Sequence, residues 1–190
     1  PEANSDIMNS KNGLPDFIRA YYHHKSADWK ENNPFPLCSW TAEQLAKMPT
    51  YYIMDLEDTM PEAVGKHMPT AQEINSCGWL TEEELKVYVS EYGRTGFQGG
   101  LNWYRSGGSA GNREHLELFS GMKIENPAMF IAGRQDWGIF QRPGAITKMK
   151  NEVCTNMGEI QLVDNAGHWV QQEQPESVFK LLLDFLGEID

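Results

Sequence analysis

Two short apolar runs in the last third of the chain, each followed by a residue capable of acid–base chemistry, constrain its fold most. The first run is Ala128-Met129-Phe130-Ile131-Ala132, with Asp136 just beyond it, and the second is Ile160-Gln161-Leu162-Val163, with His168 just beyond it. An apolar run without polar alternation is typical of a strand buried on both faces of a parallel sheet. The sequence therefore predicts two parallel strands in an α/β fold.

A helix is expected between these two strands, from about residue 145 to residue 157. Ile146, Met149 and Val153 recur at helical spacing and would lie on one face of it, and Gly158 would end it. Strand, helix and strand together make a β-α-β unit, whose crossover places the two strands side by side and parallel.

The polar residues beyond the two strands are expected to meet. Open parallel sheets place their ligand sites beyond the carboxyl ends of the strands, which is where Asp136 and His168 fall. A carboxylate and an imidazole in contact form the orienting half of a Ser-His-Asp type of triad. Taken singly, Asp136 is most simply a turn cap and His168 a surface histidine, but their matched placement favours the catalytic interpretation.

The first half of the chain predicts short helices and little strand. Helix starts are indicated at Pro15, at Ser39 or Thr41, at Pro61, and at the segments that begin with Thr70 and Thr81, where acidic residues in the first turn suit the helix dipole. A last helix is expected from Pro175 to about Leu186, and its apolar surface is wide enough to require cover on most sides.

Composition excludes some classes of partner. The 190 residues carry a formal net charge of −11, which argues against nucleic acid or an anionic membrane surface, and no apolar stretch approaches the length of a membrane span. Cys38, Cys77 and Cys154 are scattered and odd in number, so they favour free thiols in a reducing compartment, such as the cytoplasm, over a disulfide framework.

Gly107-Gly108-Ser109-Ala110-Gly111 matches the nucleophile-elbow pattern G-x-S-x-G. That pattern has catalytic meaning only between a buried strand and a helix, and the segment before it, Trp103-Tyr104-Arg105-Ser106, lacks a strand's apolar run. We therefore predict a flexible loop there. Asp136 is predicted as the acid and not as a nucleophile, because the only later carboxylate that could replace it as the acid is Asp164.

Two segments carry a resemblance to a known family. Gly133-Arg134-Gln135-Asp136 together with the segment from Ala166-Gly167-His168-Trp169 to Pro175 resembles the closing part of an α/β-hydrolase, most closely the epoxide hydrolase branch. The resemblance implies that Asp136 is the charge-relay acid and His168 the general base. It spans about residues 50–186.

The segment from Gly96 to Arg105 resembles the part of the epoxide hydrolase cap that ends in a catalytic tyrosine, which here would be Tyr104. A second cap tyrosine is expected upstream, and Tyr51 fits it best, with Tyr52 close behind. Packing in the core is an equally good explanation of Tyr51.

The resemblance implies a helical cap over residues 1–111 and the C-terminal part of an α/β-hydrolase core over residues 112–190. The chain begins at Pro1 without an initiating Met, and the family's nucleophile-bearing N-terminal half has no counterpart in it. We therefore expect that half as a second chain from the same precursor.

The implied activity is the hydrolysis of a small hydrophobic epoxide without a metal or organic cofactor. The alternatives are a serine esterase, a lactonase or a carbon–carbon bond hydrolase of the same fold, and a non-catalytic binding fragment.

Overall fold

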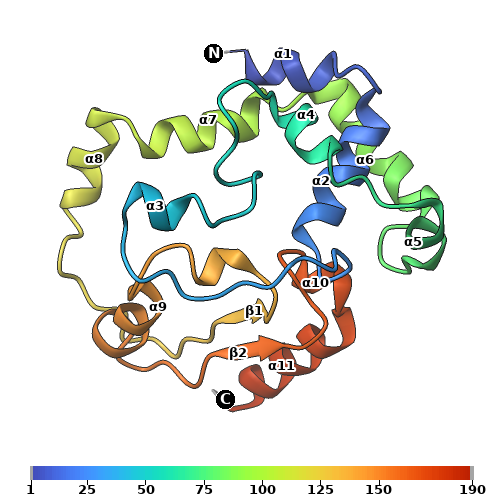
Figure 1. Ribbon diagram of the computed structural model, residues 1–190. Helices are drawn as coiled ribbons and strands as arrows, with labels where there is room; N and C mark the ends of the chain where they lie inside the picture. Colours follow the sequence, from blue (N-terminus) through green and yellow to red (C-terminus); the bar gives the residue numbers. More distant parts are fainter. Residues whose placement is uncertain (1, 189–190) are drawn as a thin grey trace.

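Helices fill the first two thirds of the chain and a small parallel sheet follows them in the computed structural model, which describes residues 2–188 (Figure 1). The helices α1 to α8 form the helical region, and residues 124–188 form the C-terminal region. The elements are α1 (Ala3–Met8), α2 (Leu14–Lys25), α3 (Ala42–Leu45), α4 (Met60–Gly65), α5 (Ala71–Ser76), α6 (Glu82–Thr95), α7 (Gln98–Gly107), α8 (Ala110–Glu117), β1 (Ile131–Gly133), η1 (Trp137–Ile139), α9 (Ala145–Lys148), η2 (Met149–Val153), β2 (Gln161–Val163), α10 (Val170–Glu173) and α11 (Pro175–Glu188).

Local capping signals explain where three helices of the helical region begin. At α4, α5 and α6 a Thr precedes the helix, and the Glu three residues later accepts a hydrogen bond from the Thr backbone N–H, which makes a capping box. The predicted helix starts near Pro61, Thr70 and Thr81 are therefore confirmed. The capping pairs are Thr59 with Glu62, Thr70 with Glu73, and Thr81 with Glu84.

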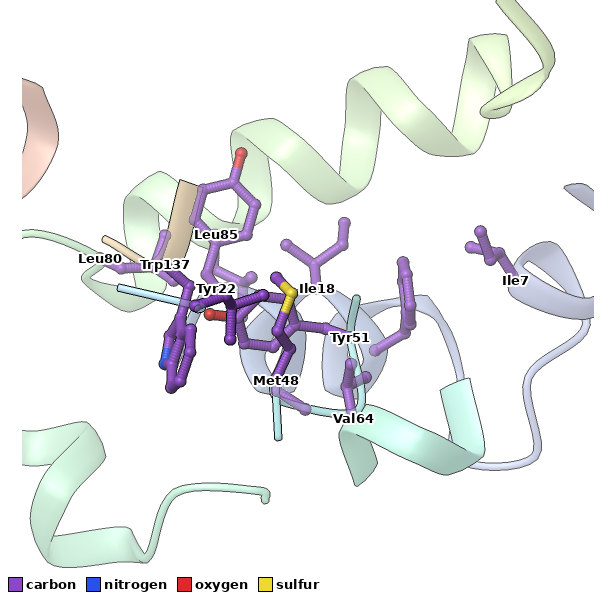
Figure 2. Packing of buried hydrophobic residues seen from close by; sticks show 12 residues of the cluster. Ile7, Ile18, Tyr22, Met48, Tyr51, Val64, Leu80, Leu85 and Trp137 are labelled. Atoms are coloured by element: carbon purple, nitrogen blue, oxygen red, sulfur yellow. The ribbon is translucent and has the colours of Figure 1, made fainter. Parts of the chain in front are cut away.

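The hydrophobic core of the helical region is built around α2, as Figure 2 shows. Ile18 of α2 is only 1% exposed and lies among side chains that come from α1, α4, α6 and the loops between them. Trp137 of the C-terminal region belongs to the same buried cluster, so the two regions share part of one core. The cluster contains Ile7, Phe17, Ile18, Ala20, Tyr22, Leu37, Met48, Tyr51, Val64, Leu80, Leu85 and Trp137.

The predicted pair of parallel strands is confirmed, although both strands are shorter than the apolar runs. β1 and β2 pair in parallel, with Ile131 opposite Gln161 and Gly133 opposite Val163. Two isolated parallel bridges, Ile124 with Cys154 and Ala128 with Met157, extend the pairing toward the amino ends. The sheet therefore ends beside the turns that carry Asp136 and His168.

The predicted helix over residues 145–157 is wrong at its end, residues 154–157. α9 ends at Lys148 and continues as one π-helical turn, η2, which ends at Val153. Cys154 and Met157 then pair with Ile124 and Ala128, so the backbone from residue 154 onward extends the ladder. Gly158 does not end the helix, since its N–H donates to the Ala128 carbonyl 3.3 Å away.

The last helix, α11, is present as predicted but leaves its apolar side chains exposed. It contacts α10, and none of its residues within 175–188 is buried. Phe179 is 63% exposed, and Leu182, Leu183 and Leu186 are also exposed. Among residues 2–188, no helix is both long enough and apolar enough to cross a membrane.

Candidate active site

Asp136 occupies the turn that follows β1 and makes two kinds of contact there. Its Oδ1 accepts a hydrogen bond from the Gly138 N–H at 2.7 Å, which starts the short helix η1. The same carboxylate lies 3.2 Å from Nδ1 of His168. Burial alone raises the pKa of Asp136, but the hydrogen bond and charge of His168, with help from Gly138 and Lys25, bring this pKa below its usual value. Asp136 thus caps a turn and faces the histidine.

His168 lies in the loop after β2, and its backbone is held by the helical region. Its N–H donates to the carbonyl of Lys25, the last residue of α2, at 2.9 Å. Its ring directs Nδ1 toward Asp136, and within residues 2–188 the other ring nitrogen has no hydrogen-bond partner. The His168 side chain is 35% exposed. The ring can therefore be oriented through one nitrogen while the other is open to a water molecule.

The two loops that carry Asp136 and His168 approach each other very closely. A Cβ atom on Gly133 would lie 2.1 Å from the Gly167 carbonyl oxygen, and a Cβ on Gly167 would lie 2.5 Å from the Lys25 carbonyl oxygen. Only glycine fits at either position without moving the backbone. Asn32 adds a polar link, since its Nδ2 donates to the Gln135 carbonyl at 2.9 Å. The loops after β1 and β2 are therefore held against the end of α2.

Lys25 places a buried ammonium group next to these loops. The residue is 6% exposed, and its Nζ donates to the Tyr21 hydroxyl at 3.2 Å. The ammonium lies 4.8–5.4 Å from the centres of four aromatic rings, which belong to Tyr21, Tyr51, Tyr52 and Trp169. Burial lowers the pKa of Lys25 to about 8, against the opposing influence of Tyr104 and Asp136.

Tyr51 and Tyr52 lie in adjacent positions with different surroundings. Tyr51 is buried in the core cluster, and its ring meets that of His24 edge-on at 4.8 Å. Tyr52 is half-buried. Burial raises the pKa of both phenols, and the charge of Asp136 raises them further. Both tyrosines therefore lie within electrostatic range of Asp136, and Tyr52 is also within range of Tyr104.

Tyr104 lies on α7, a helix that has no buried residue. Tyr104 is 80% exposed, so residues 2–188 do not enclose it in a pocket with His168. The phenol is nevertheless close enough to Lys25 and Tyr52 to influence their ionisation. The structure thus brings Asp136 and His168 into contact and leaves Tyr104 exposed.

Two other candidates have different roles. Ser109 lies between α7 and α8 and caps α8 by accepting the Asn112 N–H, with no strand before it. It is therefore not a nucleophile elbow. Asp164 forms an ion pair with Arg134 on the exposed side of the sheet end. Asp136, and not Asp164, is the carboxylate that contacts His168.

The sequence interpretation missed the residues that hold the site together. Lys25, Asn32 and Glu173 all contact the loops of Asp136 or His168, but two of them lie more than 100 positions before those loops. No local pattern signals these residues, because Lys and Glu are rarely buried. In the structure Lys25 is 6% exposed and Glu173 is 9% exposed.

Comparison with known proteins gives relatives of one kind, although no protein-family model matches the chain. Epoxide hydrolase A of Mycobacterium tuberculosis is 40% identical over 134 residues, which are 70% of this chain and 37% of that protein. The crystal structure of epoxide hydrolase A from Mycobacterium thermoresistibile is 44% identical over 60% of this chain and 34% of its own, with a TM-score of 0.53.

A wider structural match covers nearly the whole chain. An epoxide hydrolase from an endophytic Streptomyces aligns over 97% of this chain and 48% of its own, with a TM-score of 0.69 and 22% identity, which shows the fold. The chain thus spans about a third to a half of the length of these proteins. By sequence and by fold, the chain belongs to the α/β-hydrolase superfamily, in which it resembles the cap and C-terminal part of an epoxide hydrolase.

Proposed function

We propose that this chain is the cap and C-terminal part of an enzyme that hydrolyses small hydrophobic epoxides through a covalent alkyl-enzyme ester. The observation that supports it most is the contact between Nδ1 of His168 and Asp136 at 3.2 Å, in a chain that is 40% identical to an epoxide hydrolase over 134 residues. Within residues 2–188 the second ring nitrogen has no hydrogen-bond partner. The curated relatives are named for epoxide hydrolysis, and a paired carboxylate and imidazole suit its second step.

In the first step, a carboxylate oxygen attacks one carbon of the epoxide ring. The ring carbon–oxygen bond breaks, and the oxygen takes the electron pair and a proton from the Tyr104 phenol. A phenol suits this role because it keeps its proton at neutral pH and donates well to a developing alkoxide. Tyr52 is better placed than Tyr51 to assist, because it is only half-buried and lies within range of both Tyr104 and Asp136.

In the second step, His168 removes a proton from water, and the hydroxide attacks the carbonyl carbon of the ester. The bond between that carbon and the alkoxy oxygen breaks, the alkoxide takes the proton of the carboxylic acid that forms, and the diol leaves the regenerated carboxylate. Asp136 fixes the tautomer of His168 and stabilises the imidazolium that forms. The proton on His168 then returns to the tyrosine oxygen.

The attacking carboxylate would come from polypeptide outside residues 1–190. Between residues 2 and 188, Asp136 is already paired with His168, and Ser109 caps a helix. A nucleophile-bearing segment would also cover the exposed apolar face of α11. We propose that it belongs to the N-terminal part of the same enzyme, as a separate chain or a continuous one.

Isotope labelling tests the covalent mechanism. The protein to use, called here the completed enzyme, is residues 1–190 joined behind the N-terminal part of epoxide hydrolase A of Mycobacterium tuberculosis. A single turnover in H₂¹⁸O with enzyme in excess should give diol without ¹⁸O and enzyme with ¹⁸O in one carboxylate. The alkoxy oxygen of the ester comes from the enzyme, and the oxygen from water stays on the enzyme.

Diol that carries ¹⁸O from the first turnover would instead mean that water attacks the epoxide directly, and the proposal would fail. Tyr104→Phe supplies a second check, because it should slow ester formation by about 100-fold or more while leaving ester hydrolysis less affected. Tyr92→Phe, on α6, is the matched control and should change neither step.

A further inference from the structure

Glu173 is a charged residue buried beside the loop that carries His168. It ends the short helix α10 and is only 9% exposed. Among the described residues it has no ion pair with Lys, Arg or His, whereas an isolated buried carboxylate is costly. Backbone groups must therefore compensate its charge, and they identify what the carboxylate holds.

The backbone donors to Glu173 flank His168 on both sides. Its Oε1 accepts the Trp169 N–H at 3.0 Å, and the Gly167 N–H lies 3.0 Å from each carboxylate oxygen. Its Oε2 also accepts the Ala27 N–H at 2.7 Å, from the segment after α2. Hydrogen bonds to an ionised acceptor are about twice as strong as neutral ones.

The peptide between these donors has its own anchor. The His168 N–H donates to the Lys25 carbonyl at 2.9 Å, so three consecutive N–H groups, at residues 167 to 169, are each fixed. Trp169 adds packing, because its ring stacks on Tyr22 at 4.1 Å and its indole N–H donates to the Tyr22 carbonyl at 2.9 Å. By contrast, the His168 side chain is one-third exposed and is not held by burial.

We propose that Glu173 is a positioning residue for His168: by holding Gly167, Trp169 and Ala27 together, its carboxylate fixes the imidazole within hydrogen-bonding distance of Asp136. The inference rests on the proposed function, because it assigns His168 to the ester-hydrolysis step. It goes further by making the rate of ester hydrolysis depend on Glu173, a residue that touches neither the substrate nor the reacting atoms.

The geometry requires a carboxylate and excludes an amide of the same shape. A carboxylate accepts at both oxygens, and both are used here, by Trp169 and Gly167 on one and by Ala27 and Gly167 on the other. A glutamine would turn its NH₂ group toward the N–H of either Ala27 or Trp169, whichever way its amide was oriented. Glu173→Gln therefore replaces the hydrogen bond from Ala27 or from Trp169 by two opposed N–H donors, with almost no change in volume.

The test separates the two chemical steps in the completed enzyme. Glu173→Gln should slow ester hydrolysis by about 100-fold, the order expected for misplacing a catalytic group by about 1 Å, while ester formation and kcat/KM change little. KM should fall together with kcat, because the slowed step follows formation of the covalent intermediate. The alkyl-enzyme should accumulate and be visible by intact mass. Glu176→Gln, the same change at an exposed position at the start of α11, is the matched control and should behave like the unaltered enzyme.

Amide hydrogen exchange gives a readout that does not depend on turnover. Exchange at Gly167 and Trp169 should be faster in Glu173→Gln than in the unaltered protein, and this holds even if the completed enzyme proves inactive on epoxides. Equal slowing of ester formation and ester hydrolysis would mean that Glu173 only stabilises the fold, and it would overturn the proposal. Unchanged exchange at the two amides would overturn it as well. Should Glu173→Gln fail to fold, Glu173→Asp makes the same test, because a shorter carboxylate cannot reach all three partners.

Discussion

The helical region and the C-terminal region differ in where their order comes from. In the helical region, three helices start at Thr-Glu capping boxes, and Ile18 and Val64 are almost fully buried in the core cluster around α2. In the C-terminal region, α9 and α10 have no side-chain cap, the strands have three residues each, and α11 buries none of its described side chains. One region is specified locally, and the other depends on packing partners.

This difference carries over to the proposed chemistry. The C-terminal region supplies Asp136 and His168, but the end of α2 in the helical region holds the loop of His168 through the Lys25 carbonyl. The region with the weaker local order thus carries the acid–base pair, and the better ordered region positions it. Substitutions at Asp136 or His168 should therefore lower kcat most, and substitutions of packed apolar side chains should lower the free energy of unfolding.

The largest expected effect is on chemistry in the C-terminal region. In the completed enzyme, His168→Gln should lower kcat by about 10⁴-fold, because an amide cannot remove a proton from water. The alkyl-enzyme should form and persist, which intact mass after mixing with epoxide would show. His115→Gln, an exposed change on α8, is the control. A loss of less than tenfold would mean that His168 is not the base.

Asp136 and His168 could be located from the sequence, because ligand sites of parallel sheets lie beyond the carboxyl ends of the strands. Those ends can be recognised from two apolar runs. Glu173 and Lys25 could not be located in this way. Their roles arise where α2 meets the loop of His168, and Ala27 and Glu173 are 146 positions apart. Their burial follows from tertiary packing, which local patterns do not contain.

The second expected effect is on stability, at the exposed face of α11. If the N-terminal part of the enzyme covers this face, Phe179→Ala should destabilise the completed enzyme by about 3 kcal/mol, the usual cost of truncating a buried Phe. Chemical denaturation gives the free energy of unfolding. Leu56→Ala, at a residue that is 99% exposed, is the control and should have almost no effect. An equally small effect of Phe179→Ala would show that the face stays in solvent.

The third expected effect is a pH dependence that comes from Lys25. Burial lowers the pKa of Lys25 to about 8, from 10.5. Below pH 8 the Lys25 ammonium is charged in the folded and in the unfolded protein, and its burial destabilises the folded protein. Above pH 8 Lys25 loses its proton in the folded protein but keeps it in the unfolded protein up to about pH 10.5. The free energy of unfolding should therefore rise by about 2 kcal/mol between pH 7 and pH 9.5.

Lys25→Met isolates this contribution, because a methionine of similar length has no proton to lose. The difference in unfolding free energy between the completed enzyme and this variant should shrink or change sign as the pH rises from 7 to 9.5. Burial raises the pKa of Cys77 and of the buried tyrosines, which lowers stability at the upper end of this range in both proteins and cancels in the difference. A difference that is constant with pH would mean that Lys25 stays charged when buried.

The helix starts predicted from local sequence were confirmed in the helical region, whereas a helix predicted in the C-terminal region was partly wrong. The starts of α5 and α6 follow from Thr70 and Thr81, since the capping box is contained in four consecutive residues. The helix expected up to Met157 ends instead at Val153, because pairing of Cys154 with Ile124 overrides the local helical pattern. The division of the chain at residue 111 stays a prediction.

The smallest expected effect tests whether the helical region is indeed specified locally. Thr81 accepts the Glu84 N–H through Oγ1 at 3.3 Å, and its own N–H donates to the Glu84 carboxylate at 2.8 Å. Thr81→Ala should cost about 1 kcal/mol, the usual value of an N-cap. In a peptide of residues 79–97, circular dichroism should show helix that this change reduces, whereas a peptide of residues 143–158 should show little helix. Equal helicity in the two peptides would remove the distinction, because local sequence would then specify both regions to the same degree.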